Sequence, residues 1–87
     1  MSTEFVGLDV VVTGATGELG EAVARHLLGA GATVHLPVRT PDKARTLYAG
    51  AGDRVRVAAV SDLGDESAVG SFYAGLPPLW ASIHCAG

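Results

Sequence analysis

Residues 8–20 read LDVVVTGATGELG, an apolar run followed by glycines at positions 14, 17 and 20. The apolar run is typical of a buried strand, and the residues after it have the periodicity of an amphipathic helix. A glycine-rich turn between a strand and a helix is where a doubly wound parallel sheet holds the phosphates of a dinucleotide. The stretch therefore predicts an α/β fold with a dinucleotide site at its first turn.

Each glycine of the turn has a predicted role. We expect Gly14 to leave the strand with a positive φ, Gly17 to let the backbone approach a diphosphate, and Gly20 to let the helix pack closely. The anion would then lie at the helix N-terminus, against free N–H groups and the positive end of the helix dipole. The alternative is a glycine-rich turn without a ligand, because the chain has 12 glycines.

Strands and helices alternate along the chain, with strands expected at residues 8–12, 33–38, 55–60 and 79–85. The first helix is expected to end at Gly29 or Gly31. Its predicted buried stripe is Leu19, Ala22, Val23, His26, Leu27 and Ala30. Pro37 conflicts with an interior second strand unless it lies at the end of that strand, where its missing N–H breaks no hydrogen bond.

Two further helices have recognisable starts. Thr40 is expected to cap the second helix, with Pro41 at its first position, and Asp65 to cap the third. The predicted buried residues are Ala44, Leu47, Tyr48 and Ala51 in the second helix, and Val69, Phe72, Tyr73 and Leu76 in the third.

Length and composition limit the remaining possibilities. Eighty-seven residues make one domain at most, and a 48% hydrophobic, 17% charged chain is typical of a packed globule. A net charge of −3 gives no electrostatic reason to expect nucleic acid or an anionic membrane as partner. Without a long apolar run or a signal-peptide pattern, we expect a cytoplasmic protein. The single cysteine, Cys85, excludes an internal disulfide, and the three scattered histidines predict no metal site.

The residues from Thr13 to Gly20 resemble the glycine-rich opening of the short-chain dehydrogenase/reductase family. Asp62-Leu63 falls where that family contacts adenine, and Ala86-Gly87 falls where its fourth strand ends. The resemblance implies a Rossmann-like parallel sheet of order 3-2-1-4, with residues 1–87 as a single, partial dinucleotide-binding domain. The family domain continues with a catalytic Ser and a Tyr-x-x-x-Lys pair.

Two departures from the family pattern stand out. The middle glycine is Gly17, with Glu18 next to it, which is the spacing of the extended and atypical branches. His84-Cys85 replaces a pair of asparagines. The motif and the resemblance together predict these cofactor-binding residues: Gly14, Thr16, Gly17, Glu18, Leu19, Gly20, Arg39, Thr40, Asp62, Leu63, Cys85, Ala86 and Gly87.

The end of the second strand indicates which cofactor is preferred. An acidic residue about 20 residues beyond the glycines usually binds the ribose of NAD, but Val38 and Arg39 stand here instead. A guanidinium pairs well with a phosphate, so NADP is favoured over NAD. Alternatively, Arg39 is an ordinary solvated residue. Asp62 likewise either accepts from the adenine amino group or simply caps a turn.

Two classes of function remain open from the sequence. In the first, the chain is the cofactor-binding part of an NADP-dependent oxidoreductase. No catalytic residue is expected in it, because Tyr48 and Tyr73 are followed four positions later by Gly52 and Pro77 rather than lysine. In the second, it is a stand-alone nucleotide-binding or self-associating module without chemistry. In either case an apolar fourth strand at the sheet edge predicts a homo-oligomer, joined through that edge or the adjacent helices.

Overall fold

The computed structural model describes residues 4–60 and 65–85. Four strands form one parallel sheet of order β3-β2-β1-β4, as expected. The strands are β1 (Asp9–Thr13), β2 (Thr33–Val38), β3 (Val55–Ala59) and β4 (Ala81–His84). β4 is shorter than predicted, but hydrogen bonds continue on both sides of it, from Trp80 N–H to Asp9 O and from Cys85 N–H to Thr13 O.

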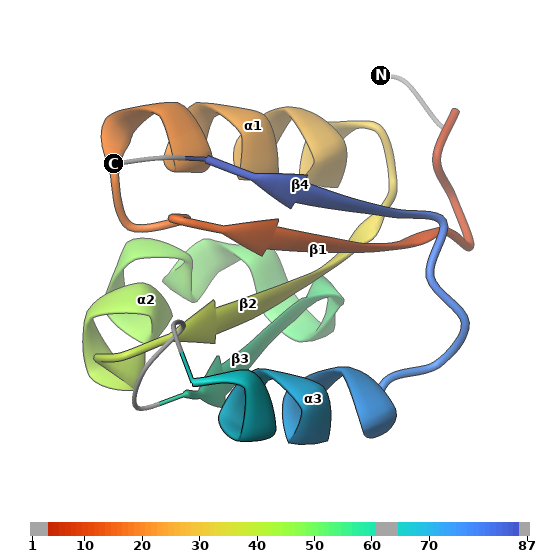
Figure 1. Ribbon diagram of the computed structural model, residues 1–87. Helices are drawn as coiled ribbons and strands as arrows, with labels where there is room; N and C mark the ends of the chain where they lie inside the picture. Colours follow the sequence, from red (N-terminus) through yellow and green to blue (C-terminus); the bar gives the residue numbers. More distant parts are fainter. Residues whose placement is uncertain (1–3, 61–64, 86–87) are drawn as a thin grey trace.

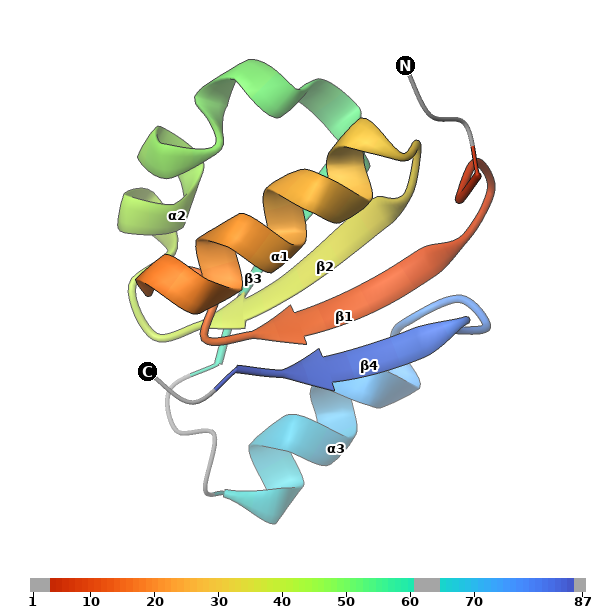
Figure 2. The same ribbon diagram turned by 90° about the horizontal axis from the view of Figure 1, so that it is seen from above.

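Helices cover both faces of the sheet (Figures 1 and 2). α1 (Glu18–Gly29) and α2 (Pro41–Leu47) lie on one face, and α3 (Glu66–Ala74) lies on the other. A 3₁₀ helix (Ala49–Arg54) continues from α2 toward β3. In the described part of the chain, no helix has the length and apolar character needed to cross a bilayer. The fold is therefore a small Rossmann-like layer structure.

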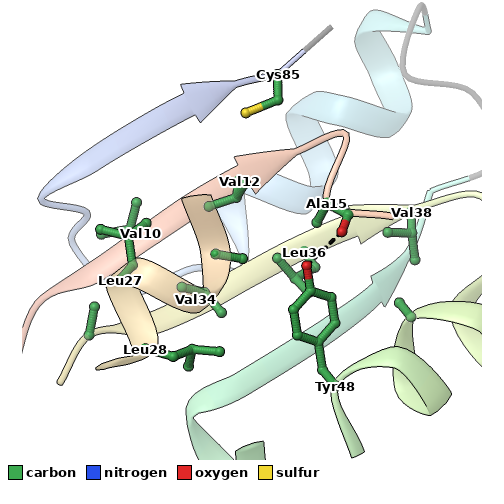
Figure 3. Packing of buried hydrophobic residues seen from close by; sticks show 13 residues of the cluster. Val10, Val12, Ala15, Leu27, Leu28, Val34, Leu36, Val38, Tyr48 and Cys85 are labelled. Carbon is green, nitrogen blue, oxygen red and sulfur yellow. Dashed lines mark hydrogen bonds between the residues drawn. The ribbon is translucent and has the colours of Figure 1, made fainter. Parts of the chain in front are cut away.

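The core lies between the sheet and α1, where alternate side chains of β1 and β2 face the helix (Figure 3). Val10, Val12, Val34 and Leu36 are completely buried. Leu27 and Leu28 of α1 pack against the same cluster (Figure 3). Burying each such side chain stabilises the fold by about 1.5–3 kcal/mol, so this face supplies most of the hydrophobic stabilisation.

The predicted buried stripe of α1 is partly wrong. Leu19 is 60% exposed, and Ala22 and His26 are also exposed. The buried residues are Gly20, Ala24, Leu27 and Leu28. The reason is that Gly20 lies against the glycine turn, which sets the rotation of the helix. Since successive residues are about 100° apart around a helix axis, Leu19 then points outward.

The predicted starts of the other two helices are confirmed, but the stripe predicted as buried in the third helix is only partly buried. α2 starts after Thr40 with Pro41 at its first turn, and Ala44 and Tyr48 are buried. Thr40, however, forms no side-chain capping hydrogen bond. The Asp65 carboxylate does cap α3 by accepting from the N–H groups of residues 67 and 68. No residue of α3 is fully buried, so its cover of the sheet is thinner than that of α1.

Pro37 is accommodated near the end of β2, as its chemistry requires. The residue is buried and aligns with Ala58 of β3. The pairing of β2 with β1 ends at Val11 and His35, two residues earlier. The missing N–H of Pro37 therefore lies beyond the paired stretch of β1 and β2.

Two glycines of α1 provide a matched test of this packing. An added Cβ at Gly20 would lie 1.9 Å from the Gly14 carbonyl oxygen, whereas one at Gly29 would meet nothing within 4 Å. We expect Gly20→Ala to lower the free energy of unfolding by about 3 kcal/mol through overpacking. Gly29→Ala should raise it by about 0.5 kcal/mol through helix propensity. Urea titrations of both variants and the parent chain measure this. Equal effects of the two substitutions would contradict the proposed packing of the helix.

Candidate functional site

The glycine turn has the tight geometry that the sequence predicts. Gly14 has a φ of +70°, which favours glycine. A Cβ there would lie 2.0 Å from the Cys85 carbonyl oxygen, so the turn and the end of β4 approach each other backbone to backbone. Gly20 is equally crowded, although its neighbours are the turn residues Gly14 and Ala15 rather than the strand. Side chains at either glycine would push the turn apart.

The start of α1 faces this turn without a side-chain cap. Gly17 is the N-cap residue and contributes no side-chain hydrogen bond. Its own N–H donates to Gly14 O at 3.1 Å, and its carbonyl accepts from Glu21 N–H at 2.9 Å. The N–H groups of the first helical turn therefore have no side-chain acceptor, and such groups are suited to an anion.

A cavity of about 300 Å³ lies between the turn and the end of β2. We call it the Arg39 pocket. Its lining is Gly14, Ala15, Thr16, Pro37, Val38, Arg39, Thr40 and Lys43. Both charged residues in this lining are cations. Among residues 4–60 and 65–85, no hydrogen bond or ion pair engages the Arg39 guanidinium or the Lys43 ammonium group. The pocket thus offers two cations to a negatively charged ligand.

Tyr48 supports the turn from below (Figure 3). Its hydroxyl donates to the Ala15 carbonyl at 2.6 Å, and the residue is only 3% exposed. Burial is the main reason why the pKa of Tyr48 is raised above 10.0, and nearby Glu21 raises it further while Arg25 lowers it. The phenol therefore remains protonated and keeps donating at neutral pH.

Arg25 links α1 to the end of α2. Its guanidinium donates to Glu21 Oε2 at 2.6 Å and to Leu47 O at 2.9 Å. The same group lies 5.3 Å from the centre of the Tyr48 ring, within cation–π range. The two helices that flank the Arg39 pocket are therefore joined beside Tyr48.

A chain of polar side chains occupies the opposite face of the sheet. Tyr73 of α3 shares a hydrogen bond with Ser82 at 2.8 Å, and Ser82 contacts His84 Nε2 at 3.3 Å. His84 Nδ1 lies 3.2 Å from Thr13 Oγ1. His84 thus links β4 to β1, and Tyr73 is bonded to this group of side chains and does not line the Arg39 pocket.

The structure brings most of the predicted site residues together. Gly14, Thr16, Arg39 and Thr40 line the Arg39 pocket. Gly17, Glu18, Leu19 and Gly20 form the start of α1, and the buried Cys85 lies behind Gly14. Asp62, Leu63, Ala86 and Gly87 lie outside the described residues.

Sequence reasoning missed the contact that Tyr48 makes at the site. Tyr48 was predicted only as part of an apolar stripe, and its hydrogen bond to the turn was not expected. Nothing in the sequence marks that contact, because the two partners are 33 residues apart. The closeness of Lys43 to Arg39, by contrast, follows from their spacing across the start of α2.

Comparison with known proteins identifies the family. The model of the NAD dependent epimerase/dehydratase family matches residues 10–87. The chain belongs to that family. It is also similar to a solved short-chain dehydrogenase/reductase family protein, with a TM-score of 0.84 and 31% identity over 97% of this chain. The resemblance to the short-chain dehydrogenases/reductases is thereby confirmed, and a nicotinamide dinucleotide is the cofactor that this family membership indicates.

Two other matches are informative. The closed form of serine dehydrogenase complexed with NADP+ has a TM-score of 0.71 and 30% identity over 82% of this chain. The phenolphthiocerol synthesis polyketide synthase type I Pks15/1 of Mycobacterium bovis is 38% identical over 90% of this chain. The chain spans 35% and 28% of the two solved structures and 4% of the polyketide synthase. It therefore corresponds to a small part of each relative.

The raised pKa of Tyr48 predicts how stability changes in alkali. As the pH rises past 10.0, the unfolded chain loses the phenolic proton before the folded chain does. The stabilisation is therefore complete below pH 10 and is lost as the pH rises through the folded pKa, with a slope of up to about 1.4 kcal/mol per pH unit.

Tyr48→Phe should remove the contribution of this phenol to the fall in the free energy of unfolding above pH 10. Urea titrations between pH 9 and 11 on the parent chain, Tyr48→Phe and the control Tyr73→Phe measure it. Parallel pH profiles for the parent chain and Tyr48→Phe would contradict the expectation.

Proposed function

We propose that this chain binds NADP(H) as the cofactor-binding part of a short-chain dehydrogenase/reductase-like oxidoreductase. The observation that carries the proposal is the Arg39 pocket, in which a guanidinium and an ammonium group occur without an acidic residue. A carboxylate at this place would repel a 2′-phosphate, whereas two cations attract it. The solved serine dehydrogenase complexed with NADP+ supports the same choice for this chain.

The residues present fit such a cofactor. The crowded backbone at Gly14 and Gly20 leaves the start of α1 close to the turn, so the turn and the helix N-terminus would hold the diphosphate. Arg39, Thr40 and Lys43 would hold the 2′-phosphate, since all three line one pocket. The hydroxyl of Thr40, which makes no capping hydrogen bond to α2, suits this role.

The remaining contacts are assigned through the family resemblance. We propose that Asp62 and Leu63 bind the adenine, and that residues 85–87 contact the cofactor beside the turn. We further propose that residues 1–87 make up a single, partial dinucleotide-binding domain.

The bound nicotinamide would supply hydride transfer, and this chain's own residues would bind and orient the cofactor. We propose that the 87 residues contribute no proton-transfer group. Tyr48 donates to a backbone carbonyl and Tyr73 pairs with Ser82, so each hydroxyl has a structural partner. No oxidation or reduction of alcohols or carbonyl compounds is expected from the isolated chain. Any turnover by the isolated chain would contradict this assignment, and turnover that survives replacement of both tyrosines by Phe would place the proton-transfer group elsewhere in the chain.

The alternative function is a stand-alone nucleotide-binding or self-associating module. The outer strand β4 favours self-association. It pairs only with β1 among the described residues, and Trp80 beside it is 54% exposed. Unpaired backbone groups next to an exposed aromatic side chain are a ready surface for another strand. We propose that a second copy of the chain pairs at this edge or against the neighbouring helical faces.

The cofactor proposal predicts a specific loss at Arg39. The parent chain should bind NADPH more tightly than NADH at low salt. Arg39→Ala should reduce the ratio of the two dissociation constants about tenfold or more. The reason is that one charge-assisted contact contributes about 1.5–3 kcal/mol. Isothermal titration calorimetry with both cofactors measures this ratio.

Arg45→Ala is the matched control, because it removes the same charge from α2 outside the Arg39 pocket. The control should keep the parent's preference. Equal affinity of the parent chain for NADPH and NADH would refute the NADP assignment.

The self-association proposal predicts a different variant effect. Ile83 and Val57 are partly buried residues at equivalent places on the two edge strands, on the same face of the sheet. Ile83→Lys should convert the oligomer to a monomer, while Val57→Lys on β3 should leave it intact. Sedimentation velocity at 10–200 µM, a range chosen to span weak association at about micromolar affinity, measures this. A folded monomeric parent chain throughout that range would rule out the proposed interface.

A further inference from the structure

The hydrogen bond from Tyr48 fixes the direction of one peptide group in the glycine turn. Ala15 is completely buried, and its carbonyl accepts from the Tyr48 hydroxyl at 2.6 Å (Figure 3). Ala15 precedes α1, which begins at Glu18, so this carbonyl lies outside the hydrogen-bond ladder of the helix. A buried carbonyl needs a partner, and Tyr48 supplies it from the end of α2.

The orientation of the Thr16 N–H follows from that bond. The described residues contain no cis peptide bond, so the Ala15–Thr16 peptide is trans and planar. In such a group the C=O and the following N–H point in opposite directions. Because the Ala15 oxygen points into the core toward Tyr48, the Thr16 N–H points away from the core.

The position of Thr16 allows this N–H to contact a ligand in the Arg39 pocket. It lines the Arg39 pocket together with Arg39 and Lys43. Within residues 4–60 and 65–85, the Thr16 N–H has no hydrogen-bond acceptor. An outward backbone donor beside two cations matches the oxygen atoms of a phosphate monoester.

We infer that Tyr48 is a positioning residue for the Arg39 pocket, and that it acts by turning the Thr16 N–H toward the bound 2′-phosphate. The inference rests on the proposed function. Tyr48 itself does not touch the ligand. Its hydroxyl holds the Ala15 oxygen, which has the same sign of charge as a phosphate, out of the pocket. The contacts of Arg25 with Tyr48 and with Leu47 O keep the ring in place.

The test compares two ligands that differ in the 2′-phosphate. Adenosine 2′,5′-bisphosphate carries it, and AMP, which is otherwise identical, does not. We expect Tyr48→Phe to weaken binding of the bisphosphate about fivefold to tenfold and to change the affinity for AMP less than about twofold, as measured by isothermal titration calorimetry. A residue that only stabilised the fold would change both ligands alike or neither.

Tyr73→Phe is the matched control. It removes a tyrosine hydroxyl that is bonded to Ser82 on the opposite face of the sheet. The control should leave the ratio of the two affinities at the parent value. An unchanged ratio in Tyr48→Phe would overturn the inference, as would an equal loss in the control.

A second measurement uses the parent chain and so does not depend on folding of the variant. Saturating adenosine 2′,5′-bisphosphate should slow amide hydrogen exchange of Thr16 at least about tenfold, while saturating AMP should not. Equal protection by both ligands would overturn the inference. A parent chain that shows no preference for the bisphosphate over AMP would refute the proposed function itself, whereas a preference that is insensitive to Tyr48 would refute only the role of Tyr48.

Discussion

The close approach of backbone to backbone at Gly14 and Gly20 is the constraint on which the rest of the structure depends. The Gly14 carbonyl lies where a side chain at Gly20 would stand, and the Cys85 carbonyl lies where one at Gly14 would stand. These contacts hold the end of β4, the turn and the start of α1 together. They also fix the rotation of α1, so that Leu27 and Leu28 complete the core while Leu19 faces outward. One tight turn thus determines the packing of the helix and the direction of its N-terminus.

The candidate site is built where that turn meets the start of α2. Hydrophobic packing positions both helices, but polar contacts determine how the site is arranged. Tyr48 bonds to the turn, and Arg25 bonds α1 to the end of α2. Arg39 and Lys43 are consequently held beside Thr16 in one pocket. The residues that bind the ligand in our proposal are distinct from those that hold them in place, of which Tyr48 is buried and Arg25 is exposed. A substitution at the buried Tyr48 is therefore expected to change affinity as well as stability.

Much of this arrangement could be predicted from the sequence, because its signals are local. The glycine spacing, Pro41 after Thr40 and the Asp65 cap each act within a few residues, and the alternation of strands and helices led to the correct sheet order through the family resemblance. The rotation of α1 was misjudged because apolar periodicity alone did not include the contact of Gly20 with the turn. The contact between Tyr48 and Ala15 could not be predicted at all, since it depends on how α2 packs. The capping bond expected of Thr40 is absent for a similar reason. The N-cap preference of threonine predicts which residue precedes the helix, but not which rotamer its side chain adopts.

The central claim is that the glycine turn and the end of β2 form one binding site for a phosphorylated dinucleotide. Amide chemical-shift mapping of the 87-residue chain during titration with NADP+ tests it most directly. The account predicts that the largest shifts occur at residues 14–20 and 38–43, with saturation at one cofactor per chain. No shifts at saturating NADP+, or shifts centred on the groove between Arg25 and Arg54 at the other end of α1, would contradict it.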